Sequence, residues 1–364
     1  MGTLSDLVIN GRFLTQPTTG VQRYQHEILA ALDVIAGERP NLSIELVTPQ
    51  LSGPPPALRH IGVRQVGRLQ GHGWEQLELP RAVKGRPLFC GGNMAPLASL
   101  YGSGPVIVTV HDLAFRYFPG SYAPTYRAIY GFLTPQILRR ASAVVTVSNT
   151  EAQSIGALYP EANPRLTAIP NGGLPCAVDP ASISPRRSGR PYILYVGSFT
   201  ERKNFSNMLI AAIAIARNRE IDVVFAGGTS RAVEGVAGKI PDDLADRIKF
   251  YHDISDAELL SLYAGASVFT FPSRFEASGL PPIEAMAFGI PVVCSDIPAL
   301  TERCGDAARY CKAEDPDSIV AAVTAVLDDP AERARLVAAG LERARRYDWL
   351  ACARATLSVI ERAA

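Results

Sequence analysis

Two glutamates, Glu276 and Glu284, stand eight residues apart in the segment EASGLPPIEAMAFGIPVV, which follows an apolar run. Carboxylates accept hydrogen bonds from the hydroxyls of a sugar or a ribose. Pro281 and Pro282 suit the first turn of a helix, where a missing N–H costs little, so residues 277–280 would present free main-chain amides at its start. Such a helix start favours an anion, for example a phosphate. In the alternative interpretation, Glu284 only complements the helix dipole and Glu276 is a solvated loop residue.

A basic pair, Arg202 and Lys203, follows the predicted strand 192–196 and the glycine turn at Gly197. A guanidinium and an ammonium beside a helix start can neutralise a diphosphate, which carries most of the charge of a nucleotide-sugar. Two solvated surface cations are the alternative, since lysine and arginine are mostly exposed. The pair is therefore a candidate for diphosphate binding.

His111 directly follows the apolar run VIVTV at 106–110. In open parallel sheets, ligands bind beyond the carboxyl ends of the strands, so this position suits a catalytic or binding side chain. Asp112 would orient the histidine or bond locally. A satisfied structural histidine is the alternative for a single residue in such a place.

Short β-branched runs alternate with longer stretches of helical period, which predicts βαβ units and parallel sheets covered on both faces. Prolines concentrate in 173–191 and break regular structure there. The sequence therefore predicts two α/β domains, 1–172 and 192–345, joined by a linker, 173–191. The predicted strands are 7–9, 43–47, 106–110, 143–147, 192–196, 222–226, 268–271 and 291–294, and the predicted helices are 21–33, 124–140, 205–218, 256–264, 281–288 and 316–327.

The composition is that of an ordinary globular protein, with 47% apolar and 20% charged residues among 364. Thirty-six basic against 35 acidic residues give a net charge of +1, so we expect no nucleic-acid partner. Six cysteines include no C-x-x-C pair, which argues against a zinc site and a disulfide framework. No signal peptide or spanning run is recognisable. This predicts a cytoplasmic protein, with peripheral contact at the inner membrane face left open.

The glutamate segment closely resembles the signature EGFGLPPLEAMACGTPVV of the retaining glycosyltransferases of family 4, the glycosyl transferases group 1. The resemblance implies the GT-B fold, in which two Rossmann-like, doubly wound parallel-sheet domains face each other across a cleft. It implies that Glu276 binds hydroxyls of the donor sugar and that Glu284 binds the ribose of the nucleotide. Ala277 and Ser278 replace the Gly-Phe of the signature, and Ala277 adds a Cβ, so the sugar stays undetermined.

Further strings resemble the same family. VGSFTERKN, with Arg202 and Lys203, is similar to its VGxLxxRKN segment, whose basic residues hold the donor diphosphate and stabilise the leaving group. His111 lies in a string similar to the family's histidine-aspartate segment, which implies an approach to the donor sugar and its anomeric centre. The loop TTGVQRY, with Gly20, is similar to the family's G-G-x-x-R-Y loop, where glycine permits close approach to a ligand.

The resemblance thus implies two sets of site residues and a terminal element. Ile254 lies near where the family packs the nucleotide base, and residues 346–364 look like the family's terminal helix, which often crosses back to the first domain. The catalytic set is His111, Glu276, Arg202 and Lys203, and the donor-binding set is Gly20, Ile254, Ala277, Ser278, Gly279, Leu280 and Glu284.

The implied activity is that of a hexosyltransferase that needs neither a cofactor nor a metal. Its co-substrate would be a nucleotide-sugar and its acceptor a glycan or lipid-linked saccharide in surface polysaccharide synthesis. GDP-mannose is the leading donor, because the His-Asp segment and the TGVQRY loop look like those of bacterial polysaccharide mannosyltransferases. UDP-glucose and dTDP-rhamnose are alternative donors. A phosphorylase, a sugar-nucleotide hydrolase and a non-catalytic sugar-binding protein are alternative functions.

Overall fold

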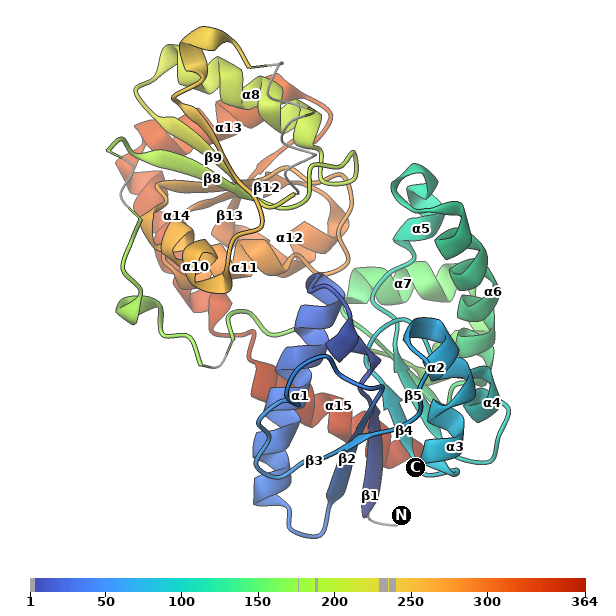
Figure 1. Cartoon of the computed structure of the whole chain (residues 1–364). Helices are drawn as coiled ribbons and strands as arrows, with labels where there is room; N and C mark the ends of the chain where they lie inside the picture. The colour runs from blue at the N-terminus through green and yellow to red at the C-terminus, as the bar shows by residue number, and fades with distance from the viewer. Residues whose placement is uncertain (1–3, 176, 187–188, 229–234, 236–239) are drawn as a thin grey trace. The chain divides into compact units, whose positions relative to one another are not determined.

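The computed structural model describes residues 4–175, 177–186, 189–228, 235 and 240–364. The chain forms two compact units (Figure 1). The first unit is Met1–Gly172 with Asp348–Ala364, and the second is Gly173–Tyr347. The segment 173–191 therefore groups with the second unit, and the last residues of the chain group with the first.

The first unit is built on a seven-stranded sheet in the order β3-β2-β1-β4-β5-β6-β7. Neighbouring strands in this order pair in parallel. The order of the first six strands is that of a doubly wound nucleotide-binding sheet. The strands are β1 (Asp6–Asn10), β2 (Ser43–Thr48), β3 (Gly62–Gln65), β4 (Leu88–Cys90), β5 (Val106–Thr109), β6 (Ala143–Thr146) and β7 (Leu166–Ala168).

Helices of the first unit cover the sheet because its central strands are apolar on both faces, as a parallel sheet requires. Trp74, Leu79 and Ile137 lie in one buried cluster with alternate residues of the strands, such as Val106 and Val108. The helices are α1 (Gly20–Glu38), α2 (Gly71–Leu77), α3 (Leu79–Val83), α4 (Leu97–Leu100), α5 (Ala114–Tyr117), α6 (Pro124–Arg140), α7 (Asn149–Leu158) and α15 (Trp349–Ala363), with short 3-10 turns η1 (Arg12–Thr15), η2 (Pro119–Ser121) and η3 (Pro160–Arg165).

The terminal helix α15 packs beside α1. Two ion pairs join the helices, Arg39 to Glu361 at 2.6 Å and Arg354 to Glu38 at 2.7 Å. The fully buried indole of Trp349 meets the ring of Tyr24 edge-on, with centroids 5.9 Å apart. This packing explains why the last residues group with the first unit.

The second unit repeats the doubly wound order in a six-stranded sheet, β10-β9-β8-β11-β12-β13. Its neighbouring strands also pair in parallel. The strands are β8 (Tyr192–Val196), β9 (Asp222–Ala226), β10 (Ile248–Tyr251), β11 (Val268–Phe271), β12 (Val292–Ser295) and β13 (Ala308–Cys311).

Successive residues of β8 enter opposite cores of the second unit, since side chains alternate along a strand. Ile193 and Tyr195 pack with α8 and α13, whereas Tyr192 and Leu194 pack with α10, α11 and α12. The helices are α8 (Phe205–Asn218), α10 (Asp256–Gly265), α11 (Leu280–Ala287), α12 (Pro298–Cys304), α13 (Pro316–Asp328) and α14 (Pro330–Ala344), with 3-10 turns η4 (Pro180–Ser182), η5 (Asp242–Leu244) and η6 (Gly305–Ala307).

The predicted helices 124–140 and 205–218 and the predicted strands 192–196, 222–226 and 268–271 are confirmed at both ends. The predicted strand 291–294 lies one residue too early, and the predicted helix 21–33 is too short, since α1 runs on to Glu38. The sequence analysis missed β3, β4, β7, β10 and β13. β4 and β7 have only three residues, and β3, β10 and β13 each contain a charged residue, so none of the five shows the continuous apolar run that revealed most of the other strands.

Cys90, Cys294, Cys304, Cys311 and Cys352 are all buried and form no disulfide with one another. No disulfide framework is therefore present among the described residues. The sixth cysteine, Cys176, lies outside the described residues.

Candidate active site

The predicted carboxylate and cations of the second unit meet in one cluster. The Nζ of Lys203 donates a hydrogen bond to the Oε1 of Glu276 at 2.6 Å, and the guanidinium of Arg202 lies 3.9 Å from Oε2 of the same carboxylate. The side chain of Glu276 is 8% exposed, that of Lys203 is 13% exposed and that of Arg202 is 22% exposed. Two cationic side chains face one carboxylate, so the formal charges of the cluster leave a surplus of positive charge.

Two loops, each following a strand of the sheet, position this cluster. Asn204 adopts a left-handed conformation, with φ 57°, at the start of α8. Its Nδ2 donates hydrogen bonds to the main-chain oxygens of Pro272, at 2.9 Å, and Ala313, at 2.6 Å. The amide of Arg274 donates to the carbonyl of Arg202 at 3.0 Å. The loop after β8 is therefore bonded to the loop after β11, which brings residues 73 positions apart into contact.

Helix α11 begins at the end of the glutamate loop, as its two prolines predict. Gly279 precedes it with φ 68°. A Cβ at Gly279 would lie 2.6 Å from Cδ2 of Leu300, so both the conformation and the close approach require glycine here. Pro281 and Pro282 remove two amides from the first turn, and the amides that remain at the helix start are those of Gly279, Leu280 and Ile283.

Ser278 adds a polar atom to this helix start. The residue is 8% exposed, and its Oγ has no hydrogen-bond partner among the described residues. A buried hydroxyl without a partner costs free energy, unless a ligand or water completes it. Ala277 beside it is half-buried.

Glu284 lies inside α11 and is held by a tyrosine. Its side chain is 2% exposed, and its Oε2 accepts a hydrogen bond from the hydroxyl of Tyr263 at 2.9 Å. Tyr263 was not among the predicted site residues, because its position follows the apolar pattern of α10 and that pattern does not reveal the partner of its hydroxyl. Ile254 is half-buried in the loop between β10 and α10 and packs against the same core.

His111 lies in the first unit, at the carboxyl end of β5. Its Nε2 is 2.9 Å from the carbonyl of Gly91, and a carbonyl only accepts, so Nε2 carries the proton. Its main-chain amide donates to the Oδ1 of Asn93 at 2.6 Å. Burial lowers the pKa of His111, against the raising effect of the Gly91 carbonyl and Asp112. The ring is therefore neutral at pH 7, with Nδ1 as its acceptor nitrogen.

Gly20 is the first residue of α1, after the N-cap Thr19, whose side chain forms a capping box with Gln22. Gly20 is exposed, and a Cβ built on it would meet no atom within 4 Å. The fold therefore does not require glycine at this position. Gly20 and His111 belong to the first unit, whereas the other predicted site residues belong to the second.

A buried polar cluster of the first unit escaped the sequence analysis. The carboxylate of Glu75, 1% exposed, accepts a hydrogen bond from Asn10 at 2.7 Å and pairs with Arg12 at 3.1 Å. His72 approaches the other carboxylate oxygen at 3.4 Å. Asn10 is the last residue of β1, and the spacing of His72 and Glu75 places both on one side of α2, which is the signal that could have revealed the cluster.

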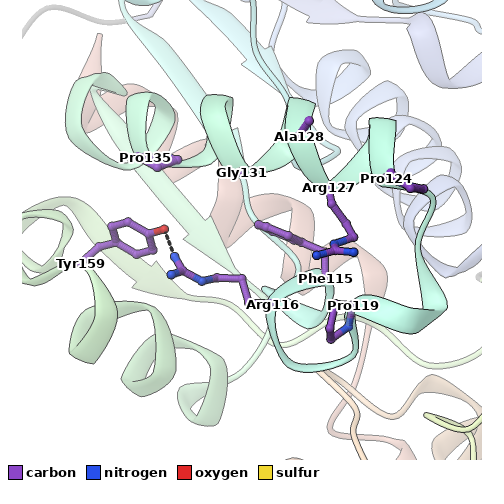
Figure 2. Close-up of a pocket in the computed structure, with 9 residues that line it drawn as sticks. All are labelled: Phe115, Arg116, Pro119, Pro124, Arg127, Ala128, Gly131, Pro135 and Tyr159. Atoms are coloured by element: carbon purple, nitrogen blue, oxygen red, sulfur yellow. Dashed lines mark hydrogen bonds between the residues drawn. The ribbon is translucent and has the colours of Figure 1, made fainter.

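A hollow of about 800 Å³ opens on the first unit between α5 and α6 (Figure 2). Arg116 and Arg127 line it together with Phe115 and several prolines. The guanidinium of Arg116 donates a hydrogen bond to the hydroxyl of Tyr159. The hollow thus combines apolar walls with two cationic side chains.

In the described part of the chain, no helix is long and apolar enough to cross a membrane.

Two family models match the chain in tandem. The family described as Glycosyltransferase Family 4 matches residues 20–172, and the family described as Glycosyl transferases group 1 matches residues 181–343. The chain belongs to these glycosyltransferases. The group 1 match contains Arg202, Lys203 and the segment with Glu276 and Glu284. The family 4 match contains Gly20 and His111.

Relatives of this glycosyltransferase include bacterial mannosyltransferases. It is 28% identical to the O-antigen chain mannosyltransferase RfbU of Salmonella typhimurium over 236 residues, which is 64% of this chain and 65% of the relative. It is 29% identical to the O-antigen chain mannosyltransferase B of Escherichia coli over 271 residues, 69% of either chain. The chain thus spans about two thirds of the length of these relatives.

Solved structures place the glycosyltransferase in the GT-B fold class. The sucrose-phosphate synthase of Thermosynechococcus elongatus superposes with a TM-score of 0.74 at 20% identity, covering 97% of this chain and 98% of the other. Anabaena HepE in complex with UDP-glucose superposes with a TM-score of 0.71 at 15% identity, covering 97% and 98%. At these identities the likeness concerns the fold, two parallel-sheet α/β domains.

Proposed function

We propose that this chain is a retaining glycosyltransferase that transfers mannose from GDP-mannose to a glycan or lipid-linked saccharide in surface polysaccharide synthesis. The observation that carries the proposal is the cluster in which Lys203 and Arg202 surround Glu276, next to the start of α11 with its unpartnered Ser278 hydroxyl. A surplus of cations beside free amides suits a diphosphate. A buried carboxylate suits sugar hydroxyls.

The predicted site residues of the second unit have distinct roles in this proposal. Arg202, Lys203 and the amides of Gly279 and Leu280 neutralise the diphosphate and stabilise it as it departs. Glu276 accepts hydrogen bonds from hydroxyls of the donor sugar. Glu284, oriented by Tyr263, accepts hydrogen bonds from the ribose. Ile254 and Ala277 shape the walls around the base and the sugar.

The transfer step breaks the bond between the anomeric carbon and the diphosphate oxygen, and the electron pair leaves with the nucleoside diphosphate. The acceptor oxygen forms the new bond to the same carbon, and its proton passes to an oxygen of the leaving phosphate. Attack on the face that the diphosphate leaves retains the configuration. Neutral His111 takes part by accepting a hydrogen bond from a sugar hydroxyl at Nδ1, and Gly20 allows a ligand to approach the main chain.

GDP-mannose is the proposed donor because the sequence relatives are named as mannosyltransferases. UDP-glucose, which the HepE structure contains, and dTDP-rhamnose are the competing donors. The deciding experiment incubates the full chain with each of the three donors and a lipid-linked saccharide acceptor, followed by mass and NMR analysis of the product. We expect an α-linked mannosyl product from GDP-mannose, and transfer to water or phosphate alone would contradict a glycosyltransferase.

We further propose that transfer needs no metal ion, because Arg202 and Lys203 already supply two positive charges for the diphosphate. The expected result is that excess EDTA leaves the initial rate of sugar transfer within about twofold of the untreated enzyme. A loss of rate on chelation that Mg²⁺ or Mn²⁺ restores would contradict this.

The acceptor side of the proposal includes contact with an anionic membrane surface. The run from Leu113 to Ser148, which contains α5 and α6, has four arginines and no acidic residue, and Phe132, Tyr117 and Ile129 are 62%, 46% and 38% exposed. Exposed apolar side chains beside cations suit lipid headgroups and the acyl boundary. The hollow between α5 and α6, with Arg116 and Arg127, would receive a headgroup phosphate (Figure 2).

We therefore expect the full chain to co-sediment with vesicles that contain anionic lipid and not with vesicles of phosphatidylcholine alone. Phe132→Ser should weaken this binding several-fold. Ile210→Ser provides the matched control, because Ile210 is 55% exposed on α8 of the other unit. Equal weakening by both variants, or equal binding to both kinds of vesicle, would contradict this contact surface.

A further inference from the structure

Helix α7 begins with a capping box that is only half formed. Its first residues, SNTE at 148–151, match the S-x-x-E pattern, in which serine bonds the third helical amide and glutamate bonds the N-cap amide in return. Ser148 does its part, since its Oγ accepts a hydrogen bond from the amide of Glu151 at 3.1 Å. In α10 the same pattern is complete, because Glu258 returns to the amide of Ser255 at 2.9 Å.

The carboxylate of Glu151 bonds a different segment instead. Its Oε1 accepts a hydrogen bond from the main-chain amide of Leu113 at 3.1 Å, across 38 positions of sequence. Glu151 is 1% exposed. The fold therefore buries a carboxyl group that helix capping alone would leave at the surface, and directs it at the loop after β5.

That loop contains His111 and is bonded from three directions. Asn93 and Gly91, beyond β4, bond the amide and the ring of His111. Asp112 bonds locally, since its Oδ1 accepts from the amide of Ala114 at 2.9 Å. Glu151 supplies the third attachment, at Leu113. Because main-chain groups at 111 and 113 are both fixed, the position of the His111 ring depends on both attachments.

We propose that Glu151 is a positioning residue that holds the loop 111–113, and through it His111, in the arrangement that sugar transfer requires. The inference rests on the proposed function, since it assigns an effect on turnover, but the attachment itself can be tested without turnover. Glu151 touches no substrate in this proposal. It acts through the amide of Leu113.

The surroundings of Glu151 give the attachment a pH dependence. Burial, and then the charge of Asp112, raise the pKa of Glu151 to about 8, against the lowering effect of the hydrogen bond from the Leu113 amide. Tyr117 of α5 also faces it, because the charge of Glu151 contributes to raising the pKa of that tyrosine. The charged residues of η3, which packs against α7, are engaged elsewhere: Glu161 with Arg139, and Arg165 with main-chain carbonyls. Glu151 is thus protonated at neutral pH, and its ionisation places a second negative charge near Asp112.

The sign of the stability effect follows from this raised pKa. The folded chain binds a proton at Glu151 that the unfolded chain releases above its ordinary pKa of 4.5. Folding is therefore progressively disfavoured by this group as the pH rises from about 4.5 to about 8. Glu151→Gln cannot ionise, so the melting temperature of the wild type should fall relative to this variant across that window.

The experiment compares wild type, Glu151→Gln, Glu151→Ala and a control, Glu332→Gln. Glu332 is the third residue of α14, as Glu151 is of α7, and its side chain pairs with Arg309 and Arg335. We expect kcat of the wild type to fall as the pH rises through about 8, and the KM for the donor to stay unchanged. Glu151→Gln should keep near-normal kcat at pH 7 and lose the fall above pH 8. Glu151→Ala should lower kcat at least about tenfold at every pH, and Glu332→Gln should match the wild type.

Two results would overturn the proposal: a kcat of Glu151→Ala within twofold of wild type, or the same alkaline fall of kcat in wild type and Glu151→Gln. The melting temperatures separate this from a failure of the proposed function. If neither the wild type nor any variant transfers sugar, the proposed function fails. The attachment of Glu151 is tested without turnover: it is overturned if the melting temperature of the wild type does not fall relative to that of Glu151→Gln between pH 4.5 and 8.

Discussion

Glu276→Gln lowers sugar transfer roughly 100- to 1,000-fold, the range for removal of one preorganised electrostatic group, while the chain stays folded. The amide keeps the size of the side chain and one acceptor oxygen, but it removes the negative charge that Lys203 contacts at 2.6 Å. The ammonium then binds the diphosphate without an opposing charge, and the sugar hydroxyls lose a charged acceptor. Initial rates at saturating donor, with melting temperatures, measure the effect.

The matched control is Glu314→Gln. Glu314 also pairs with a cation of the second unit, Arg274, at 2.8 Å, but its side chain is 73% exposed. Exposed ion pairs contribute about 0–1 kcal/mol, so this variant should keep wild-type rates. Turnover of Glu276→Gln within twofold of wild type, with an unchanged melting temperature, would remove Glu276 from the active site.

Lys203→Met should raise the KM for the donor and lower kcat, with a combined loss in kcat/KM of about 100-fold or more. Methionine fills a similar volume without the charge, so the leaving diphosphate loses its nearest ammonium. Arg202 remains 3.9 Å from Glu276 and supplies part of the charge, which is why some activity should persist. Lys203→Arg should recover part of the lost rate. Steady-state kinetics with varied donor measure both parameters.

Lys312→Met is the control for this variant, since Lys312 is 72% exposed and pairs with Asp296 on the same unit. It should leave both kinetic parameters unchanged. The double variant Lys203→Met/Glu276→Gln should lose less activity than the product of the two single losses. Its loss should be close to the larger single loss, because the effects of residues that act as a unit are not additive. Full multiplication of the two effects would indicate that Lys203 and Glu276 act separately.

The sequence predicted four of the six strands of the second sheet and the helix that follows the glutamate loop, because the signals there are local. The run Tyr192–Val196 is apolar throughout, as a strand buried on both faces must be, and Pro281 with Gly279 defines where α11 begins. The predicted helix 316–327 is likewise preceded by a local signal, because the Oδ1 of Asp315 accepts a hydrogen bond from the amide of Asp317 at 2.9 Å.

The contacts that complete the site are not local, and the sequence did not reveal them. Lys203 and Glu276 meet across 73 positions, and only the order of the strands brings their loops together. Tyr263 followed the apolar pattern of α10, which conceals the bond from its hydroxyl to Glu284. Glu151 matched a local capping pattern, and the fold uses its carboxylate elsewhere. Pairing of side chains across loops depends on tertiary packing, which periodicity does not record.

A calorimetric titration of the full chain with GDP-mannose, for the wild type and for Glu284→Gln, tests whether the second unit binds a nucleotide-sugar. We expect saturable one-to-one binding by the wild type and at least about tenfold weaker binding by the variant, because the amide leaves the ribose with a weaker acceptor. Equal affinities of the wild type and Glu284→Gln would contradict a nucleotide-sugar site in the second unit. So would the absence of binding heat when the wild type is titrated with each of GDP-mannose, UDP-glucose and dTDP-rhamnose.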